Sequence, residues 1–224
     1  MGIRACIFDQ DGTMFDTERL FGIAWREAVN RLGLTPPVDD AFHDSLCGTA
    51  GEAMLSRIRA RYPSADPAAI RDLCFRLCFE MQDSDLTEKP GLHDIVDALR
   101  ARGIRLAIGS STRRSQILRN LRRSGLDNAF EVVVSGDDIA HSKPHPECFL
   151  KAAAALGLPP SDCCVFEDSF NGVRAARSAG CITIMIPDRI QPTDEIRALA
   201  DAVCPDFFAA LRWLEQYWHE ICVQ

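Results

Sequence analysis

The spacing of apolar residues changes near residue 90, and this change divides the chain into two kinds of segment. Before it, apolar residues recur three or four positions apart, which is typical of amphipathic helices. The first predicted helix contains Leu20 and Trp25 and ends at Gly33, since glycine commonly follows a helix. Asp66 and Pro67 predict the start of another helix, as an N-cap followed by proline. The later helices predicted here are a short one from Asp39 or Asp40, 51–62 and 66–81.

From Gly91 onward, short apolar runs alternate with amphipathic segments. Runs rich in β-branched residues predict strands, and the segments between them predict helices. The predicted strands are 4–8 near the amino terminus and then 104–108, 131–134, 163–166 and 182–186. The predicted helices of this part are 92–102, 113–123, 146–156, 171–179, 195–200 and 207–221. Strands separated by helices need crossover connections, so the pattern predicts a parallel sheet with helices on both faces.

The helical block interrupts the chain directly after its first strand. The sequence therefore predicts an α/β fold of two domains with an unusual division. One is a core of residues 1–15 and 90–224, and the other is an all-helical domain of residues 16–89. A chain of 224 residues is long enough to bury a sizeable hydrophobic core of this kind.

Two aspartates stand where the first strand ends, in the sequence Asp9-Gln10-Asp11-Gly12-Thr13. Ligands of open α/β sheets bind at the carboxyl ends of strands, which is where these side chains are predicted to lie. Residues two apart in a strand share a face, so Asp9 and Asp11 are expected to point into one crevice. Two carboxylates so close repel each other unless a cation lies between them or one is protonated. The pair is typical of metal-assisted nucleophilic and acid/base chemistry.

Other predicted strands are also followed by polar residues, and in a parallel sheet all these exits open on the same edge. Ser110 offers a hydroxyl near the start of a helix, where backbone N–H groups also suit a phosphate. Lys143 offers a positive charge, and Glu167 and Asp168 offer carboxylate oxygens for a hard cation. A hydroxyl, an ammonium group and a metal site together are what phosphoryl transfer requires.

Composition limits the classes of partner. Hydrophobic residues make up 47% of the chain, as in a soluble globular protein, and the net charge of −7 argues against nucleic acid. The sequence contains no apolar run of about twenty residues, so no membrane span is predicted. The amino terminus enters a strand without a leader segment, which makes the cytoplasm the expected location.

Most of the cysteines, histidines and arginines are expected to have structural roles and not chemical ones. The ten cysteines include no Cys-x-x-Cys pair, which predicts small buried residues rather than disulfides or zinc ligands. The five histidines share no metal-ligand spacing, so none is assigned to a metal. The basic segment 113–123 predicts a solvated helix face, from which Arg113 or Arg114 could reach phosphate. Aromatic residues between Trp213 and Trp218 predict packing, or a dimer contact if exposed; a monomer or weak homodimer is expected.

Taken in order, these motifs resemble the haloacid dehalogenase superfamily. The similarity covers essentially the whole chain and points to its β-phosphoglucomutase-like branch of phosphatases and phosphomutases with a helical cap. It rests on Asp9 to Thr13, on Ser110, on Lys143 followed by proline, and on Glu167-Asp168. The resemblance implies a Rossmann-like core, with the helical block as a cap that closes over the substrate.

The resemblance also implies a role for each residue. Asp9 would be the nucleophile that forms an aspartyl-phosphate, and Asp11 would be the general acid and base. Asp9, the backbone carbonyl of Asp11 and Asp168 would hold Mg²⁺. Thr13 would fix the turn, and Glu167 would hold the lysine or a metal-bound water. The residues implied to contact the transferring phosphoryl group are Asp9, Gly109, Ser110, Ser111 and Lys143.

Departures from the family pattern narrow the expected reaction. The haloalkanoate dehalogenases and the phosphonatases of this superfamily lack an aspartate at the position of Asp11, so phosphorus–oxygen cleavage is favoured. The mutases use a histidine after the acidic turn and a cap arginine, where this chain has Phe21 and Gly51. Hydrolysis of a small phosphorylated metabolite, such as a phosphosugar, is therefore expected. The alternatives are a sugar phosphomutase and a non-catalytic sensor of a phosphorylated ligand.

Overall fold

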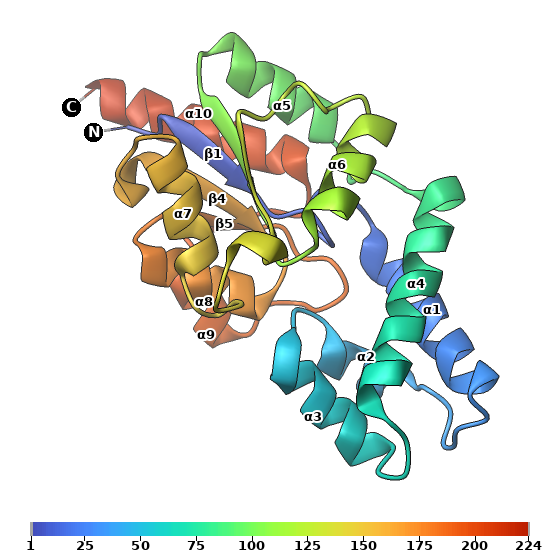
Figure 1. Cartoon of the computed structure of the whole chain (residues 1–224). Helices are drawn as coiled ribbons and strands as arrows, with labels where there is room; N and C mark the ends of the chain where they lie inside the picture. Colours follow the sequence, from blue (N-terminus) through green and yellow to red (C-terminus); the bar gives the residue numbers. More distant parts are fainter. Residues whose placement is uncertain (1, 224) are drawn as a thin grey trace.

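The computed structural model describes residues 2–223 of the chain, and the side chains of residues 2–219. It has a layered α/β part and a group of helices at one end (Figure 1). The helices of this group are α1 (Thr17–Arg31), α2 (Asp40–Leu46), α3 (Gly51–Arg61) and α4 (Pro67–Asp85). The strands are β1 (Ala5–Phe8), β2 (Arg105–Gly109), β3 (Val132–Val134), β4 (Cys163–Glu167), β5 (Ile182–Met185) and β6 (Ala202–Val203). The helices of the layered part are α5 (Leu92–Ala101), α6 (Arg114–Arg123), α7 (Glu147–Ala155), α8 (Phe170–Ala179), α9 (Asp194–Leu199) and α10 (Phe207–Val223).

The strands form one parallel sheet in the order β3-β2-β1-β4-β5-β6. In this sheet Phe8 lies opposite Ile108 on one side and Phe166 on the other. The residues that follow in the three central strands, among them Asp9 and Glu167, therefore come out at the same edge. The register of the sheet thus assembles polar groups that are far apart in the sequence.

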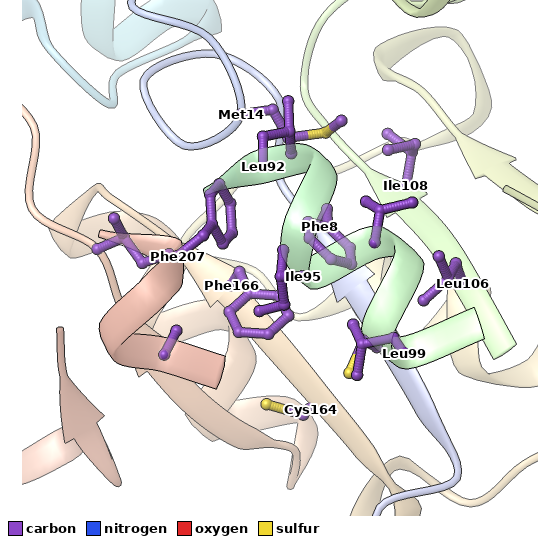
Figure 2. Packing of buried hydrophobic residues seen from close by; sticks show 14 of the residues in the cluster. Phe8, Met14, Leu92, Ile95, Leu99, Leu106, Ile108, Cys164, Phe166 and Phe207 are labelled. Atoms are coloured by element: carbon purple, nitrogen blue, oxygen red, sulfur yellow. The ribbon is translucent and has the colours of Figure 1, made fainter. Parts of the chain in front are cut away.

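The sheet is buried on both faces because successive side chains point to opposite sides. Phe8, Ile108 and Phe166 pack against α5, α6 and α10 on one face (Figure 2). Ile7 and Val165 pack against α7 and α8 on the other face. The rings of Phe8 and Phe166 have centroids 4.6 Å apart. Burying each such side chain contributes about 1.5–3 kcal/mol, so this layer anchors the strand ends that carry the polar residues.

Helices α1 to α4 have a hydrophobic core of their own, centred on residues such as Trp25, Ile58 and Cys74. The two linkers that join this group to the layered part run side by side. The Asp16 N–H donates to the Thr87 carbonyl at 2.9 Å, and the Lys89 N–H donates to the Met14 carbonyl at 2.9 Å. That the four helices act as a separate cap domain of residues 16–89 stays a prediction.

The predicted α/β fold with a parallel sheet is confirmed. The sequence pattern missed β6, because a strand of two residues shows no periodicity. Helix α4 continues to Asp85 instead of ending near Met81, and its extra turn buries Gln82 completely. Among the described residues, no helix is long and apolar enough to cross a membrane.

The cysteines follow the prediction with one exception. The nine cysteines with described side chains are free, and all of them except Cys47 are buried. Cys47 is half-buried and its thiol donates to Glu18 Oε2 at 3.2 Å, so treating it as a packing residue is wrong. Cys222 lies outside the residues whose side chains are described. The aromatic residues of α10 (Trp213, Tyr217, Trp218) pack against the hydrophobic core of the sheet, as predicted.

Candidate active site

The turn after β1 is tight, and its glycine has a geometric reason. Gly12 adopts φ +80°, a conformation that favours glycine, and a Cβ there would lie 2.3 Å from an Asp168 carboxylate oxygen. Its N–H donates to Thr17 Oγ1 at 3.1 Å and to the Phe15 carbonyl at 2.9 Å. The turn therefore folds back on itself directly beside the carboxylate of Asp168.

Asp9 and Asp11 share one side of this turn, as their spacing predicts. Both line a cavity of about 970 Å³, while Gln10 between them is fully buried on the other side. The Gln10 amide donates to the Ile117 carbonyl at 3.3 Å and accepts from Asn120 at 3.4 Å. Asn120 in turn bonds Gln82 of α4 at 3.1 Å, so a buried polar network ties the turn, α6 and α4 together.

Lys143 lines the cavity with its ammonium group fully engaged. Its Nζ donates at 2.6 Å to Asp9 Oδ1, at 2.6 Å to Glu167 Oε1 and at 3.1 Å to the Gly109 carbonyl. The same atom lies 4.7 Å from the centre of the Phe149 ring. Although burial disfavours the charged form, the carboxylates of Asp9 and Glu167 raise the pKa of Lys143. The lysine is therefore a fixed positive charge next to Asp9.

The carboxylate of Glu167 is held in position to accept a hydrogen bond from Lys143. One carboxylate oxygen accepts from Lys143, and the other accepts from the Ser169 N–H at 2.9 Å and the Ser169 hydroxyl at 3.0 Å. Gly172 makes room for it, since a Cβ there would lie 1.8 Å from the carboxyl carbon of Glu167. Both oxygens of Glu167 are thus committed to protein donors.

Replacing Gly172 by alanine is expected to push Glu167 away from Lys143. We expect the free energy of unfolding to fall by about 1–3 kcal/mol from overpacking. We also expect kcat to fall at least roughly tenfold, since about 1.4 kcal/mol of lost positioning energy has that effect. Thermal unfolding and initial rates measure the two effects. Gly2→Ala, where nothing lies within 4 Å of the added carbon, is the control; equal behaviour of the two variants would contradict the prediction.

Asp168 and Asp9 offer the oxygens that a divalent cation needs. The Thr13 hydroxyl donates to Asp168 Oδ1 at 2.8 Å, and carboxylate oxygens of Asp9, Glu167 and Asp168 lie within 4.8 Å of one another. Asp9 and Asp168 each keep one oxygen without a hydrogen bond from a described residue, whereas Glu167 does not. Hard cations such as Mg²⁺ prefer oxygen ligands of this kind. The donor set of Asp9 and Asp168 therefore fits a magnesium ion.

The crowding of acids changes their protonation. Burial raises the pKa of Asp9 to about 8, with Glu167 adding to the effect and Lys143 opposing it. Burial, followed by the charges of Glu167 and Asp9, also raises the pKa of Asp168. One ammonium group among three carboxylates leaves an excess of negative charge. A bound cation would relieve it.

Asp11 is held by a residue that the sequence did not single out. The Thr112 hydroxyl donates to Asp11 Oδ2 at 2.5 Å, while Oδ1 is buried without a hydrogen bond from any described residue. Burial raises the pKa of this carboxyl group above its ordinary value. The protonated form of Asp11 is therefore favoured, and this residue lines the cavity.

The loop after β2 supplies fewer backbone donors than predicted. The N–H of Ser110 donates to the Val134 carbonyl at 3.0 Å, and the N–H of Thr112 donates to the Ser110 hydroxyl at 3.2 Å. The Ser110 hydroxyl group accepts this bond and keeps its own proton for another acceptor. Arg114 donates to the Val133 carbonyl and pairs with Asp138 at 2.9 Å. Of the two arginines predicted to reach phosphate, Arg114 is therefore held away from the cavity, whereas Arg113 lines it.

The large cavity brings most of the predicted residues together. Its lining contains Asp9, Asp11, Ser110, Ser111, Lys143, Glu167 and Asp168. Gly109 and Thr13 lie behind this lining and act through their hydrogen bonds to Lys143 and Asp168. Of the wall that the helical group contributes, the sequence singled out only Phe21 and Gly51. Its residues include Phe21, Trp25, Arg71, Phe75, Arg76 and Phe79.

The spacing along α4 was the signal for this wall. Arg71, Phe75 and Phe79 recur four residues apart, and Arg76 lies three positions before Phe79, so they share one side of the helix. The sequence does not distinguish these aromatic residues from core residues, because periodicity does not say which part of a helical face is left open to a cavity. Among described residues, Arg76 of this face forms no ion pair, whereas Arg71 pairs with Asp72 at 2.6 Å.

Comparison with known proteins gives the family. The family described as haloacid dehalogenase-like hydrolase matches residues 3–180. Protein CbbY from Rhodobacter capsulatus is 32% identical over 94% of this chain and 96% of its own length. A phosphorylated carbohydrates phosphatase from Thermotoga maritima is 32% identical over 80% of this chain and 82% of its own length.

A solved structure agrees with the sequence matches. CbbY from Rhodobacter sphaeroides, in a variant bound to xylulose-(1,5)bisphosphate, is 28% identical with a TM-score of 0.79. The match covers 92% of this chain and 95% of that protein. With the parallel sheet and the acidic cavity described above, these matches show that the chain belongs to the haloacid dehalogenase-like hydrolases.

Proposed function

We propose that the protein is a Mg²⁺-dependent phosphatase that hydrolyses a phosphorylated sugar through an aspartyl-phosphate on Asp9. The observation that carries this proposal is the grouping of Asp9, Lys143 and Asp168 in the lining of one large cavity. Lys143 holds one oxygen of the Asp9 carboxylate, which leaves the other oxygen to attack phosphorus. Lys143 would then exchange the Gly109 carbonyl for an oxygen of the transferring phosphoryl group, and the hydroxyl of Ser110 would hold another.

Groups that line the cavity can give and take every proton that the two steps of the reaction require. As the bond between Asp9 and phosphorus forms, the bond between phosphorus and the sugar oxygen breaks, and Asp11 gives its proton to that oxygen. Asp11, now ionised, takes a proton from a water molecule, whose oxygen attacks phosphorus. This second attack breaks the bond to Asp9 and releases inorganic phosphate. Asp11 is suited to both steps because it lines the cavity beside Asp9 and burial raises its pKa.

The magnesium ion would be held by Asp9, by Asp168 and by the backbone carbonyl of Asp11. When bound, it would neutralise charge on the carboxylates and on the phosphoryl oxygens. Glu167 is not proposed as a direct ligand, because both of its oxygens already accept from Lys143 and Ser169. Its proposed function is to position the lysine.

Hydrolysis is favoured over phosphate transfer between positions of a sugar. Phe21 and Gly51 stand where the mutases of the resemblance have a histidine and an arginine, and both residues line the cavity. A phenyl ring takes up no proton and a glycine holds no phosphate. A mutase would have to retain a bisphosphate intermediate, and neither Phe21 nor Gly51 offers a polar side chain to bind it.

The cavity wall suits a sugar. Aromatic rings of Phe21, Trp25 and Phe75 provide apolar surface, and a few charged groups fix orientation, as in many small-molecule sites. The relatives include a phosphatase named for phosphorylated carbohydrates and a protein bound to a sugar bisphosphate. We therefore propose a phosphorylated sugar as the substrate class.

The test is phosphate release from a panel of sugar monophosphates and bisphosphates, with and without Mg²⁺. We expect release from at least one sugar phosphate, and only with the metal. Conversion of β-glucose 1-phosphate, primed with its bisphosphate, separates the alternatives, since a mutase accumulates the 6-phosphosugar instead of free phosphate. If no phosphate were released from any sugar phosphate or from a generic aryl phosphate, the proposal would be refuted. The remaining alternative would be a non-catalytic sensor of a phosphorylated ligand.

Arg76 is expected to contribute when the substrate has a second anionic group. It lines the cavity and forms no ion pair or side-chain hydrogen bond with the described residues. Arg76→Ala should raise KM for a sugar bisphosphate roughly tenfold, which corresponds to a loss of about 1.4 kcal/mol of binding free energy. The KM for the monophosphate should change by less than about twofold. Arg100→Ala, on the outer surface of α5, is the matched control. Equal changes for both substrates would contradict the prediction.

The metal-free protein is expected to lose stability as the pH rises. A carboxyl group with a raised pKa binds its proton more tightly when folded, so the folded state holds more protons between about pH 4 and pH 8. The free energy of unfolding therefore falls across this range. Mg²⁺ at about 100 times its dissociation constant adds about 2.7 kcal/mol, or roughly 5–10 °C in Tm.

Thermal unfolding at about pH 5.5 and pH 8.5 measures this effect. We expect the Tm increase with a fixed Mg²⁺ concentration to be larger at the higher pH, because the cation competes with protons for Asp9 and Asp168. Asp168→Asn should remove most of the increase. An equal increase at both pH values, or in the variant, would refute the assignment of these ligands.

A further inference from the structure

A second group of metal-binding side chains lies in the helical part of the protein. It consists of Glu18 on α1, His43 on α2 and Cys47 at the carboxyl end of α2. A carboxylate oxygen, an imidazole nitrogen and the thiol sulfur all lie within 4.8 Å of one another. Glu18 Oε2 is 3.2 Å from Cys47 Sγ and 3.3 Å from His43 Nε2. This group shares no residue with the acidic site of Asp9 and Asp168.

The imidazole of His43 is buried and unsatisfied. The residue is fully buried, and among described residues neither ring nitrogen has a hydrogen-bond partner. Nε2 is close enough to Glu18 for an ion pair, but the angles do not make a hydrogen bond. A buried polar group of this kind is unusual in a folded protein and calls for an explanation.

The space around His43 depends on a glycine. A Cβ on Gly22 of α1 would lie 2.8 Å from the imidazole Cε1 and 3.0 Å from Nδ1. Gly22 is therefore the reason that an imidazole ring fits against α1 at the level of Glu18. Glycine is less favourable than alanine inside a helix. Its presence at position 22 is explained by the close approach of the His43 ring to the backbone of α1.

Two of the three distances between ligand atoms fit a tetrahedral zinc site, and the third, between Cys47 and His43, is below 4.8 Å. His43 and Cys47 are four residues apart and so project from the same side of α2, while Glu18 faces them from α1. Zinc bonds of about 2.0–2.3 Å in a tetrahedron separate neighbouring ligand atoms by about 3.3–3.5 Å. The distances from Glu18 Oε2 to Cys47 Sγ (3.2 Å) and to His43 Nε2 (3.3 Å) are close to these separations.

Two of the three side chains can be reached from cavities, whereas His43 lies behind them. Glu18 and Cys47 line both the large cavity and a second cavity of about 260 Å³. The second cavity also contains Asp44 and Arg189, which are paired with each other. A water molecule could enter by this route and complete a tetrahedron.

We propose that Glu18, His43 and Cys47 bind one Zn²⁺ ion, or another divalent cation that accepts sulfur and nitrogen ligands. Such donors distinguish the site from the oxygen-only acidic site, which suits Mg²⁺. Without a cation, burial and the Glu18 carboxylate raise the pKa of the Cys47 thiol, which donates its proton to Glu18. On binding, sulfur bonds to the cation and this proton passes to solvent. The proposal is independent of the phosphatase assignment.

A cation here would fix the loop that follows α2. The Gly48 carbonyl accepts from the Asn171 side chain at 2.8 Å, and Thr49 lines the same two cavities. Binding at Cys47 would therefore hold this loop between α1 and the layered part of the protein.

The test is a titration of Co²⁺ into the full chain in the presence of excess Mg²⁺. Cobalt bound to a thiolate gives a charge-transfer absorption that carboxylate sites lack. We expect the band to saturate at one Co²⁺ per chain and to disappear when Zn²⁺ is added. Cys47→Ser should abolish the band, and His43→Gln should weaken binding by more than about 100-fold. Cys204→Ser is the control for loss of a distant buried thiol and should keep the band.

Two further measurements complete the experiment. Asp9→Asn should keep the band, because the acidic site does not contribute. Zn²⁺ should protect Cys47 of the unmodified protein from alkylation by iodoacetamide, mapped by peptide mass spectrometry, which needs no variant. The proposal is overturned if no charge-transfer band forms, if the band survives in Cys47→Ser, or if Zn²⁺ leaves the alkylation of Cys47 unchanged at a pH and reaction time that label it in the metal-free protein.

Discussion

Replacing Asp9 by asparagine is expected to lower kcat by a factor on the order of 10⁴ or more, since removal of a catalytic nucleophile has effects of this size. The amide oxygen still accepts from Lys143, but an amide does not attack phosphorus to form the acyl phosphate. We also expect no phosphorylated protein in the variant. Initial rates with the best sugar phosphate, and intact mass after rapid quenching, measure the two effects.

The same variant should fold normally. Burial raises the pKa of Asp9 to about 8, so the folded protein resists the charged form and tolerates a neutral amide well. Lys143 keeps Glu167 and the Gly109 carbonyl as acceptors. We therefore expect a Tm at neutral pH equal to that of the unmodified protein or higher. Turnover within about tenfold of normal, a loss of about 1.4 kcal/mol or less, would show that Asp9 is not the nucleophile.

The fold was predictable because the sheet is buried on both faces. The residues of β1 are all buried, and a strand in this position must be apolar throughout, so it appears in the sequence as an unbroken run. The acidic turn was predictable for the same reason, since the run stops at Asp9. Residues directly after such runs come out at one edge of a parallel sheet. This explains how Asp9, Ser110 and Glu167 could be grouped in advance.

The contacts between helices and loops were not predictable from spacing. The bond from Thr112 to Asp11 joins residues about a hundred positions apart, and nothing in the sequence pairs them. The wall of α4 depends on how the helical group is oriented against the sheet, which the hydrophobic period does not encode. The approach of Glu18 to His43 and Cys47 likewise depends on the packing of α1 against α2. Only the spacing of four between His43 and Cys47 was visible in the sequence.

Replacing Asp11 by asparagine is expected to separate the two halves of the reaction. An asparagine keeps the shape of the side chain and can accept from Thr112, but it neither donates a proton to the leaving oxygen nor takes one from water. General acid–base catalysis contributes about 10²–10⁴-fold, and kcat for a sugar phosphate should fall by this factor. Steady-state rates with a sugar phosphate and with an aryl phosphate measure the loss for a poor and for a good leaving group.

The aryl substrate makes the prediction specific to proton transfer. An aryl oxide leaves without protonation, so Asp11→Asn should still phosphorylate Asp9 and release a burst of about one phenol per chain. Hydrolysis of the aspartyl-phosphate then lacks its base, and the phosphorylated form should accumulate. Asp9→Asn gives no burst and serves as the control. If Asp11→Asn lost the burst as well, the loss would lie in binding or in the geometry of the turn, and Asp11 would not be the acid and base.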